Sequence, residues 1–152
     1  MEPTIQHLEK IISNYTRRLE AVPEATYNAK PGPGQWSRKE MLGHLIDSAQ
    51  NNIRRFIVAQ YEETPVILYN QDKWVDLTGY QRYPTRDLIT LWILLNRHIC
   101  RVLRSMPPGG ANRKCFMGNS QPHTLEWVAA DYCNHLLHHL HRILDLDPIA
   151  YP

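Results

Sequence analysis

Four stretches of this chain place apolar residues at every third or fourth position, the spacing that gives an α-helix one buried face. Proline and glycine interrupt the chain between them: we expect no helix in AVPEATYNAKPGPGQ, and MPPGG ends the third helix. Four amphipathic helices predict an all-α fold, a four-helix bundle whose long connecting loops allow crossovers. The predicted helices run from Thr4 to about Ala21, from Ser37 to about Ala59, from Thr85 to about Ser105, and from Thr124 to Leu146.

The second helix begins with the clearest local signal. Ser37 and Glu40 have the spacing of a capping box, in which each side chain bonds the backbone of the other. Trp36 and Met41 flank this box and can form a hydrophobic staple. Threonines are expected to cap the other helices: Thr4, Thr85 and Thr124.

The segment YEETPVILYNQDKWVDLTGYQRYP, between the second and third predicted helices, has no helical period. Val66–Tyr69 resembles a short strand, but the sequence offers no second strand to pair with it. Connections this long are usually lids, binding loops or disorder, and the aromatic residues here should hold the segment against the protein. We therefore expect an ordered flap, in which Trp74 lines a pocket or packs as core.

Length and composition limit the possible functions. A chain of 152 residues without an internal repeat predicts one domain over 1–152. Its 17 basic and 15 acidic residues are interspersed, which argues against a nucleic-acid partner. The apolar runs are too short to cross a membrane, and the three cysteines form no CxxC pair, so we expect free thiols and a cytoplasmic location.

Histidine is the unusual residue type, because four of the eight histidines lie within the seven residues from His135 to His141. On a helix, His135 and His139 share a face, with Cβ atoms about 5–6 Å apart. Such a pair can hold a transition-metal ion if a third ligand is supplied, and we predict that His44 supplies it. The predicted helix of His44 also carries a polar seam, formed by Ser48, Asn51, Asn52 and Arg55. Of these residues, Asn51 and Asn52 are expected to line the pocket.

The same histidines have simpler interpretations. A histidine-rich helix end is often only polar and exposed, and a lone histidine such as His44 is more often structural. We expect His138 and His141 to be exposed or at an interface. Three protein ligands with one open position are nevertheless the pattern of a catalytic rather than a structural zinc site.

Three segments, WSRKEMLGHLIDSAQNN, YNQDKWV and TLEWVAADYCNHLLHHLHRIL, resemble the DinB/YfiT-like superfamily of four-helix bundle proteins. The superfamily is named for a DNA-damage-inducible member, and its usual metal site has three histidines. The resemblance runs from about Trp36 to Leu144 and, by position, implies that His44, His135 and His139 are the metal ligands. It also implies a homodimer, and it gives no reason to expect DNA binding.

The resemblance implies a metal-dependent enzyme that acts on a small molecule. The superfamily includes bacillithiol and mycothiol S-transferases, a mycothiol-dependent maleylpyruvate isomerase and proteins described as metal-dependent hydrolases. A transferase would hold a low-molecular-weight thiol on a divalent ion, with zinc or nickel expected first, as a thiolate nucleophile. A hydrolase would activate water and benefit from a carboxylate base.

Three carboxylates are candidates for that base. Asp72 lies in QDKW, which recurs in the relatives, so we predict a catalytic role for it, with loop capping as the alternative. Asp131, one helical turn before His135, is expected to orient that histidine from behind the metal. Asp47 is expected to be a solvated helix carboxylate.

Two other functions compete with an enzyme. The first is a stress-response module that binds a metal without catalysis. The second is a bundle without a physiological metal, whose histidines pack or sense pH.

Overall fold

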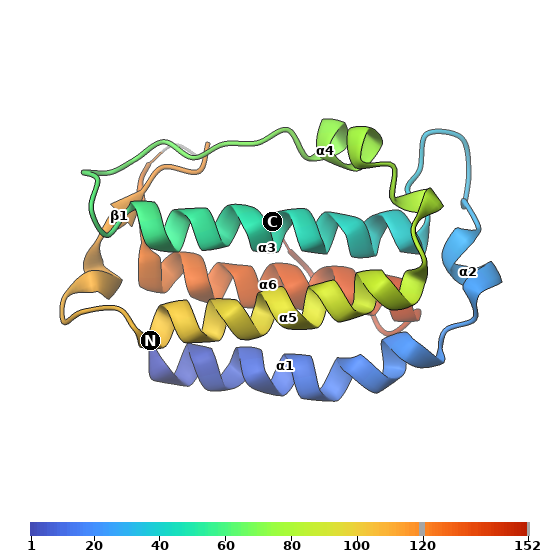
Figure 1. The fold of residues 1–152 in the computed structure, drawn as a ribbon, viewed down its shortest axis with the longest axis horizontal. Coiled ribbons are helices and arrows are strands. Elements are labelled where there is room, and N and C mark those ends of the chain that lie inside the picture. Colours follow the sequence, from blue (N-terminus) through green and yellow to red (C-terminus); the bar gives the residue numbers. More distant parts are fainter. Residues whose placement is uncertain (119–120, 152) are drawn as a thin grey trace.

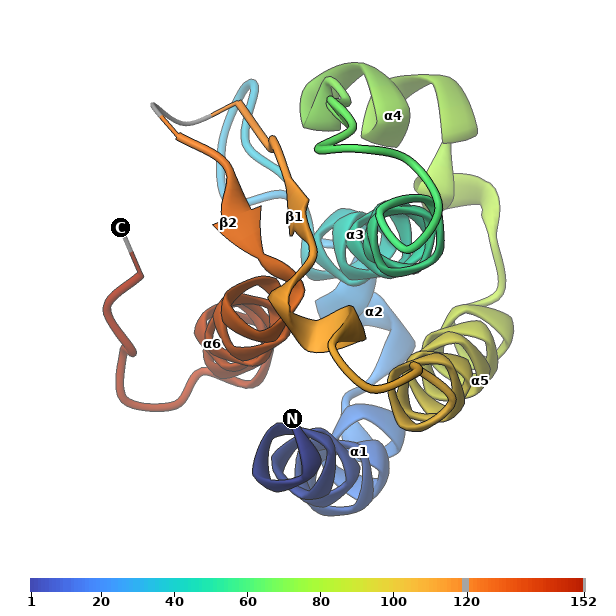
Figure 2. The ribbon, with the colours of Figure 1, turned by 90° about the vertical axis from the view of Figure 1, so that its left-hand side faces the viewer.

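Four long helices form the body of the computed structural model, which describes residues 1–118 and 121–151 (Figure 1). In cross-section they lie in the cyclic order α1, α5, α3, α6, so that α3 and α1 are diagonal to each other (Figure 2). α1 and α6 run in one direction and α3 and α5 in the other, which confirms the predicted four-helix bundle with crossover connections. The helices are α1 (Glu2–Ala21), α3 (Arg38–Val58), α5 (Thr85–Arg104) and α6 (Leu125–Leu144).

The apolar stripes of the four helices meet in one core. Trp92 of α5 is 0% exposed and is the largest of the fully buried side chains. The core is completed by residues from every long helix, among them Leu8, Leu45, Phe56, Ile99, Leu136 and Leu140. No helix in the described part of the chain combines the length and hydropathy needed to span a membrane.

Two of the predicted helix caps are confirmed. The Ser37 side chain accepts a hydrogen bond from the Glu40 backbone N–H at 3.1 Å, and Glu40 Oε2 accepts one from the Ser37 N–H at 2.8 Å. Thr124 Oγ1 accepts a hydrogen bond from the Trp127 N–H at 3.2 Å. These bonds fix where α3 and α6, the two helices that carry the histidines, begin.

The other two caps were predicted wrongly. α1 begins at Glu2, before Thr4, and α5 has Pro84 rather than Thr85 at its N-cap position. A proline at the start of a helix has a favourable φ and loses no hydrogen bond there, because the first N–H groups have no partner within the helix. Proline therefore replaces a side-chain cap at these two ends.

Two short helices lie where none was predicted. α2 (Glu24–Asn28) begins directly after Pro23, and its Tyr27 is buried and donates a hydrogen bond to the Leu19 carbonyl at 2.9 Å. α4 (Gln71–Thr78) is capped by Asn70 and ends at Gly79, whose φ of 67° is in the left-handed region. α4 packs on the outside of α3, so the segment expected to form a flap contains a short helix that follows an extended segment.

That extended segment has the pairing partner that the sequence did not reveal. β1 (Lys114–Cys115) and β2 (His123–Thr124) form a small antiparallel ladder just before α6. Val66 forms a parallel bridge with Phe116, which corrects the expectation that Val66–Tyr69 had nothing to pair with. Two short 3-10 turns complete the chain: η1 (Tyr80–Arg82) and η2 (Gly110–Asn112).

Candidate metal centre

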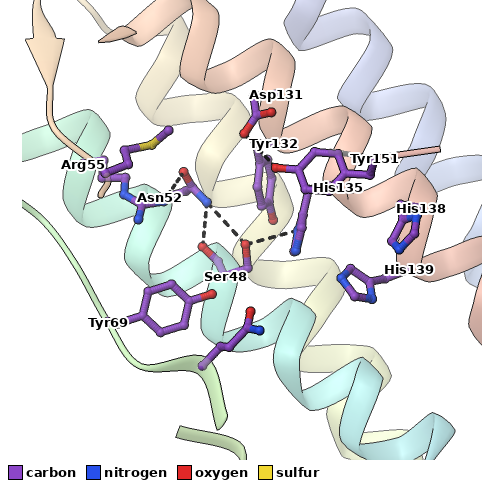
Figure 3. A pocket seen from close by; sticks show the side chains of 12 residues that line it. Ser48, Asn52, Arg55, Tyr69, Asp131, Tyr132, His135, His138, His139 and Tyr151 are labelled. Atoms are coloured by element: carbon purple, nitrogen blue, oxygen red, sulfur yellow. Dashed lines mark hydrogen bonds between the residues drawn. The ribbon is translucent and has the colours of Figure 1, made fainter. Parts of the chain in front are cut away.

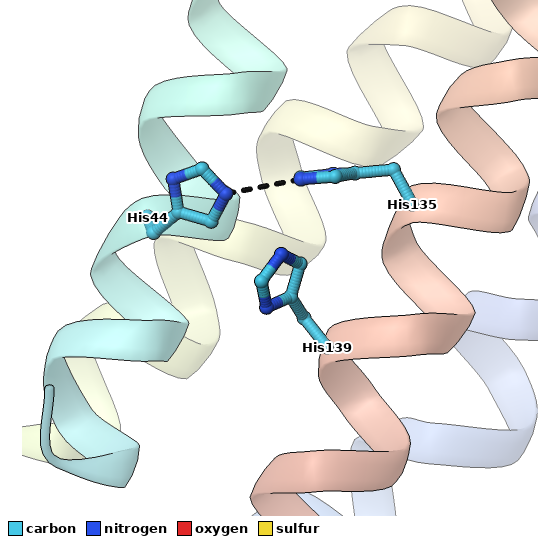
Figure 4. Close-up of side chains that lie close together, drawn as sticks. All are labelled: His44, His135 and His139. Carbon is cyan, nitrogen blue, oxygen red and sulfur yellow. Dashed lines mark hydrogen bonds between the residues drawn. The ribbon is translucent and has the colours of Figure 1, made fainter. Parts of the chain in front are cut away.

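Three imidazole rings from two helices face one another inside the bundle (Figure 4). His44 comes from α3, and His135 and His139 come from successive turns of α6. One ring nitrogen from each lies within 4.8 Å of the others, and Nε2 of His44 and Nε2 of His135 are 3.0 Å apart. In a tetrahedral site with metal–nitrogen distances of about 2.0–2.1 Å, the nitrogens would lie roughly 3.3 Å apart. The spacing between His44 and His135 is close to this value, and a ring nitrogen 4.8 Å from another would move inward by about 1.5 Å to share one ion.

All three imidazoles are held in the neutral form, the only form with a lone pair for a metal. Burial lowers the pKa of His44, which is 1% exposed, to about 4. Burial and the neighbouring histidines lower the pKa of His135 to about 3 and that of His139 to about 2. Near neutral pH the cluster therefore offers nitrogen lone pairs rather than repelling charges.

The Nδ1 atoms, on the other side of the rings, have few hydrogen-bond partners. Nδ1 of His44 and Nδ1 of His139 are buried and have no hydrogen-bond partner among the described residues. Ser48 Oγ lies 3.5 Å from His135 Nδ1, which is a weak contact. In the metal-free protein the 3.0 Å contact between the two Nε2 atoms of His44 and His135 needs a proton on one of them, and a metal ion would take the place of that proton. Neutral imidazoles grouped in this way fit a transition metal such as zinc or nickel.

The backbone beside His44 is shaped by a glycine. A Cβ on Gly43 would come within 2.1 Å of Cδ2 of Tyr80, so only glycine lets that ring lie against α3. The Tyr80 hydroxyl donates a hydrogen bond to Asp47 Oδ1 at 2.5 Å. Asp47 is buried, which raises its pKa to about 6, so it is not the solvated carboxylate that the sequence suggested.

A cavity of about 470 Å³ opens beside the rings of His135 and His139 (Figure 3). A space of this size suits a small molecule. Most of its wall is polar, and it is built from α3, α6, the segment before α4 with the first residue of α4, the loop after β1 and the tail after α6. The lining residues are Ser48, Asn52, Arg55, Tyr69, Gln71, Met117, Asp131, Tyr132, His135, His138, His139 and Tyr151.

Only one of the two predicted pocket asparagines is in the cavity wall. Asn52 lines the cavity, donates to the Ser48 carbonyl at 2.9 Å and accepts a hydrogen bond from Arg55. Asn51 is buried and donates instead to the Asp47 carbonyl at 2.9 Å. One residue is a rotation of about 100° on a helix, and here that rotation turns Asn51 away from the cavity that Asn52 lines.

The two predicted site residues of α4 lie away from the cluster. Asp72 is exposed in the first turn of α4 and is not in the cavity wall. Trp74 is 36% exposed and packs edge-on against Tyr69, with ring centroids 5.5 Å apart. Of these two aromatic residues, Tyr69 reaches the cavity, because it precedes α4 on the extended segment.

Asp131 lies in the cavity wall, but its hydrogen-bond partner is Tyr151 rather than His135. Its Oδ2 accepts a hydrogen bond from the Tyr151 hydroxyl at 2.9 Å, and burial raises its pKa. The Tyr151 ring also contacts His135, with ring centroids 5.3 Å apart. Sequence reasoning missed Tyr151, and an aromatic residue in a short tail gave no signal strong enough to find it.

The tail after α6 folds back along that helix and uses the remaining two histidines. His138 Nδ1 lies 2.6 Å from the Ile149 carbonyl, and His141 Nδ1 lies 2.7 Å from the Asp147 carbonyl. Both histidines are half-buried rather than exposed, and the alternative that they lie at an interface stays a prediction. Their role in the described structure is to hold the tail, and with it Tyr151, against α6.

Sequence comparison relates the chain to a set of bacterial proteins. The sequence model of the DinB superfamily matches residues 7–143. A candidate metal-dependent hydrolase from Oceanobacillus iheyensis is 30% identical over 114 residues, which are 74% of this chain and 66% of that protein. The candidate metal-dependent hydrolase YfiT from Bacillus subtilis is 25% identical over 93% of this chain and 81% of its own length.

Solved structures share the fold. YfiT from Bacillus subtilis, described as having an unusual four-helix bundle topology, matches with a TM-score of 0.84 at 24% identity, over 95% of this chain and 83% of that one. The mycothiol-dependent maleylpyruvate isomerase matches with a TM-score of 0.77 at 14% identity. The match covers 98% of this chain but 61% of the isomerase, so the isomerase contains a large part that has no counterpart here.

Proposed function

The chain belongs to the DinB superfamily, and we propose that it is a metal-dependent enzyme acting on a small molecule through an ion held by His44, His135 and His139. One observation carries the proposal: three neutral imidazoles meet within 4.8 Å at the edge of a polar cavity. Three protein ligands beside an open space are the arrangement of a catalytic centre. A divalent ion bound there would lower the pKa of a coordinated thiol or water and supply a nucleophile at neutral pH.

The chain's own residues position the reactants and exclude water. α3 and α6 hold the three rings before any ligand binds, and Trp36 covers His44 with its ring centroid 5.1 Å from the imidazole. Asn52, Tyr69 and Arg55 present polar groups to whatever enters the cavity. The resemblance to the superfamily also supports proposing a single domain that works as a homodimer in the cytoplasm.

Thiol transfer is the reaction that we place first. A thiolate needs no protein base to act as a nucleophile, and Asp131 is the one carboxylate in the described cavity wall. Asp131 is hydrogen-bonded to Tyr151, and the exposed position of Asp72 gives no support for the base role predicted for it. Hydrolysis is the second candidate, with Asp131 as the base, and it is favoured by the relatives described as candidate metal-dependent hydrolases.

Metal analysis tests the ligand set. The protein should be purified without a histidine tag, and we expect about one ion per chain, with most of it lost in His135→Ala. His98→Ala, which removes an exposed histidine of α5, is the matched control and should bind metal like the wild type. The same small fraction of metal in wild type and His135→Ala would show that the three rings are not a metal site.

Activity is then tested with metal-loaded protein, a small thiol and a reactive electrophile such as a haloarene or an epoxide. We expect the thiol to be consumed faster than with the metal-free protein, and this difference should vanish in His135→Ala. A parallel assay with small esters and amides tests hydrolysis. A protein that binds the metal but accelerates neither reaction would instead be a non-catalytic metal-binding module.

A further inference from the structure

Arg55 is a buried cation on the same face of α3 as the metal centre. His44, Ser48, Asn52 and Arg55 follow one another at steps of four, four and three residues, which aligns them along one side of the helix. Arg55 is 9% exposed and lines the cavity with Ser48 and Asn52 (Figure 3). A row of polar groups therefore leads from the three imidazoles to a guanidinium.

The guanidinium is poorly satisfied by the protein around it. Of its five N–H groups, one bonds Asn52 Oδ1 at 3.3 Å and another bonds the Ile67 carbonyl at 3.2 Å. Both acceptors are neutral, and Nε is buried without a partner in the described chain. Among the described residues, no carboxylate oxygen lies within 4.0 Å of an Arg55 nitrogen, so Arg55 forms no ion pair.

Two other buried charged residues of α3 have the ion-pair partner that Arg55 lacks. Lys39 is 2% exposed, and its Nζ lies 2.5 Å from Glu24 Oε1. Glu40 is buried and pairs with Lys30 at 2.8 Å. A buried charge without a counter-ion is costly, so folded proteins seldom keep one that has no ligand or partner to meet. Asp131 shares the cavity and attracts Arg55 at longer range, but its carboxylate is hydrogen-bonded to Tyr151 and forms no ion pair with Arg55.

We propose that Arg55 binds an anionic group, a carboxylate, at the far end of the molecule that occupies the cavity. The proposal rests on the proposed function, because the other end of that molecule is the group that the ion at the three histidines would hold. Arginine recognises a carboxylate through two parallel hydrogen bonds, and one N–H on each terminal nitrogen of Arg55 has no hydrogen bond among the described residues. The substrate class is therefore a small thiol, or another metal-binding molecule, that carries a carboxylate distant from its metal-binding atom.

The helix geometry sets the length of that molecule. His44 and Arg55 are 11 residues apart, which is about 16 Å along a helix axis. Long side chains on a helix lean toward its N-terminus, so the Arg55 side chain shortens this span in the direction of His44. We therefore expect a minimum chain length, below which a ligand reaches the ion but not Arg55.

Matched thiols can measure both the charge preference and the span. The full chain is loaded with Co²⁺, whose visible thiolate absorption reports binding, and is titrated with mercaptoacetate, mercaptohexanoate and mercaptooctanoate and with the methyl ester of each. Acid and ester offer the same thiol and differ in the carboxylate charge. For the longer chains we expect the acid to bind at least about tenfold more tightly than the ester. Equal affinity of acid and ester at every length would overturn the proposal.

Two variants and a control locate the effect. Arg55→Gln should abolish the preference for the acid, and Arg55→Lys should keep part of it. Arg54→Gln removes the exposed neighbouring arginine and should behave as the wild type. A preference for the acid that survives in Arg55→Gln would overturn the proposal. If Arg55→Gln does not fold, the wild-type ratio of acid to ester and its change in Arg55→Lys decide the question.

Failure of the metal proposal gives a different result. No cobalt–thiolate band with any of the thiols, acid or ester, would count against the proposed function. Arg55 can still be tested in the metal-free protein, by following hexanoate binding as chemical-shift changes. Hexanoate should bind wild type and Arg54→Gln more tightly than Arg55→Lys or Arg55→Gln, and equal binding to all of them would overturn the role of Arg55.

Discussion

α3 and α5 are adjacent helices of similar length that do different work in the bundle. α5 buries 8 of its 20 residues, six of them apolar, and leaves its other face in solvent. α3 buries 15 of its 21 residues, and eight of these are polar or charged. Burying so many polar groups is unfavourable unless they bond one another or a ligand. The comparison indicates that α5 is a scaffold, whereas α3 carries much of the candidate site and needs other elements to cover it.

The largest effect on stability should come from the scaffold helix. Trp92→Ala removes a side chain that is 0% exposed, so we expect the free energy of unfolding to fall by about 3–5 kcal/mol. Leu94→Ala, on the exposed face of the same helix, should change it by less than about 0.5 kcal/mol. Urea unfolding measures both. The division of roles would break down if Trp92→Ala weakened metal binding while leaving stability intact.

The next effect should be specific to α3. His44→Ala removes one of three proposed ligands, and we expect metal affinity to fall by about 100-fold or more, since even a lost partner of a ligand can cost that much. Competition with a coloured chelator measures the affinity. His98→Ala, from the exposed face of α5, should leave it unchanged. Equal losses in the two variants would mean that binding does not depend on the cluster.

Two buried groups of α3 should respond to pH in opposite directions in the metal-free protein. The pKa of His44 is lowered from 6.5 to about 4, so the unfolded chain takes up the proton first, and stability falls as the pH drops from about 6.5 to 4. The pKa of Asp47 is raised from 3.8 to about 6, so the folded chain takes up the proton first, and stability rises over nearly the same window. Each contribution is about 1–3 kcal/mol, at about 1.4 kcal/mol per pKa unit.

Variants separate these two contributions. His44→Gln should flatten the loss of stability between pH 6.5 and 4, and Asp47→Asn should steepen it. Urea unfolding of the metal-free protein at several pH values provides the measurement. If the dependence of stability on pH changed in the same direction in both variants, the opposite contributions assigned to His44 and Asp47 would be wrong.

The smallest effect on stability should come from changes at the first residues of α3 and α5. Ser37→Ala removes one half of the capping box of α3 and should cost about 1 kcal/mol. Thr85→Val should cost less than about 0.5 kcal/mol, because the Thr85 side chain does not cap α5. Thermal unfolding followed by circular dichroism can compare them. A larger cost for Thr85→Val than for Ser37→Ala would reverse the interpretation of the two helix ends.

The long helices could be predicted from sequence because each contains several turns of apolar period, and α3 and α6 also have side-chain caps. α2 and α4 were missed because five and eight residues are too few for a periodic pattern. They depend on tertiary contacts, such as the burial of the Tyr27 side chain of α2 and the Val75 side chain of α4. Local patterns do not contain that information.

The candidate site was also predicted only in part. The spacing of His135 and His139 indicated a shared face, and the polar seam around His44 indicated a second wall; the structure brings the three rings together, and their role as ligands is a proposal. The difference between Asn51 and Asn52 depends on the exact rotation of α3, and the position of Tyr151 depends on how the tail folds. Neither follows from residue spacing.

The contact between Trp36 and His44 has a practical consequence. An indole ring whose centroid is 5.1 Å from an imidazole is close enough for its fluorescence to respond to an ion on that imidazole. Open-shell ions such as Co²⁺, Ni²⁺ and Cu²⁺ quench nearby indole emission, whereas closed-shell Zn²⁺ does not quench in this way. The protein therefore contains its own optical reporter of site occupancy, and the emission lost in Trp36→Phe would identify the ring that provides it.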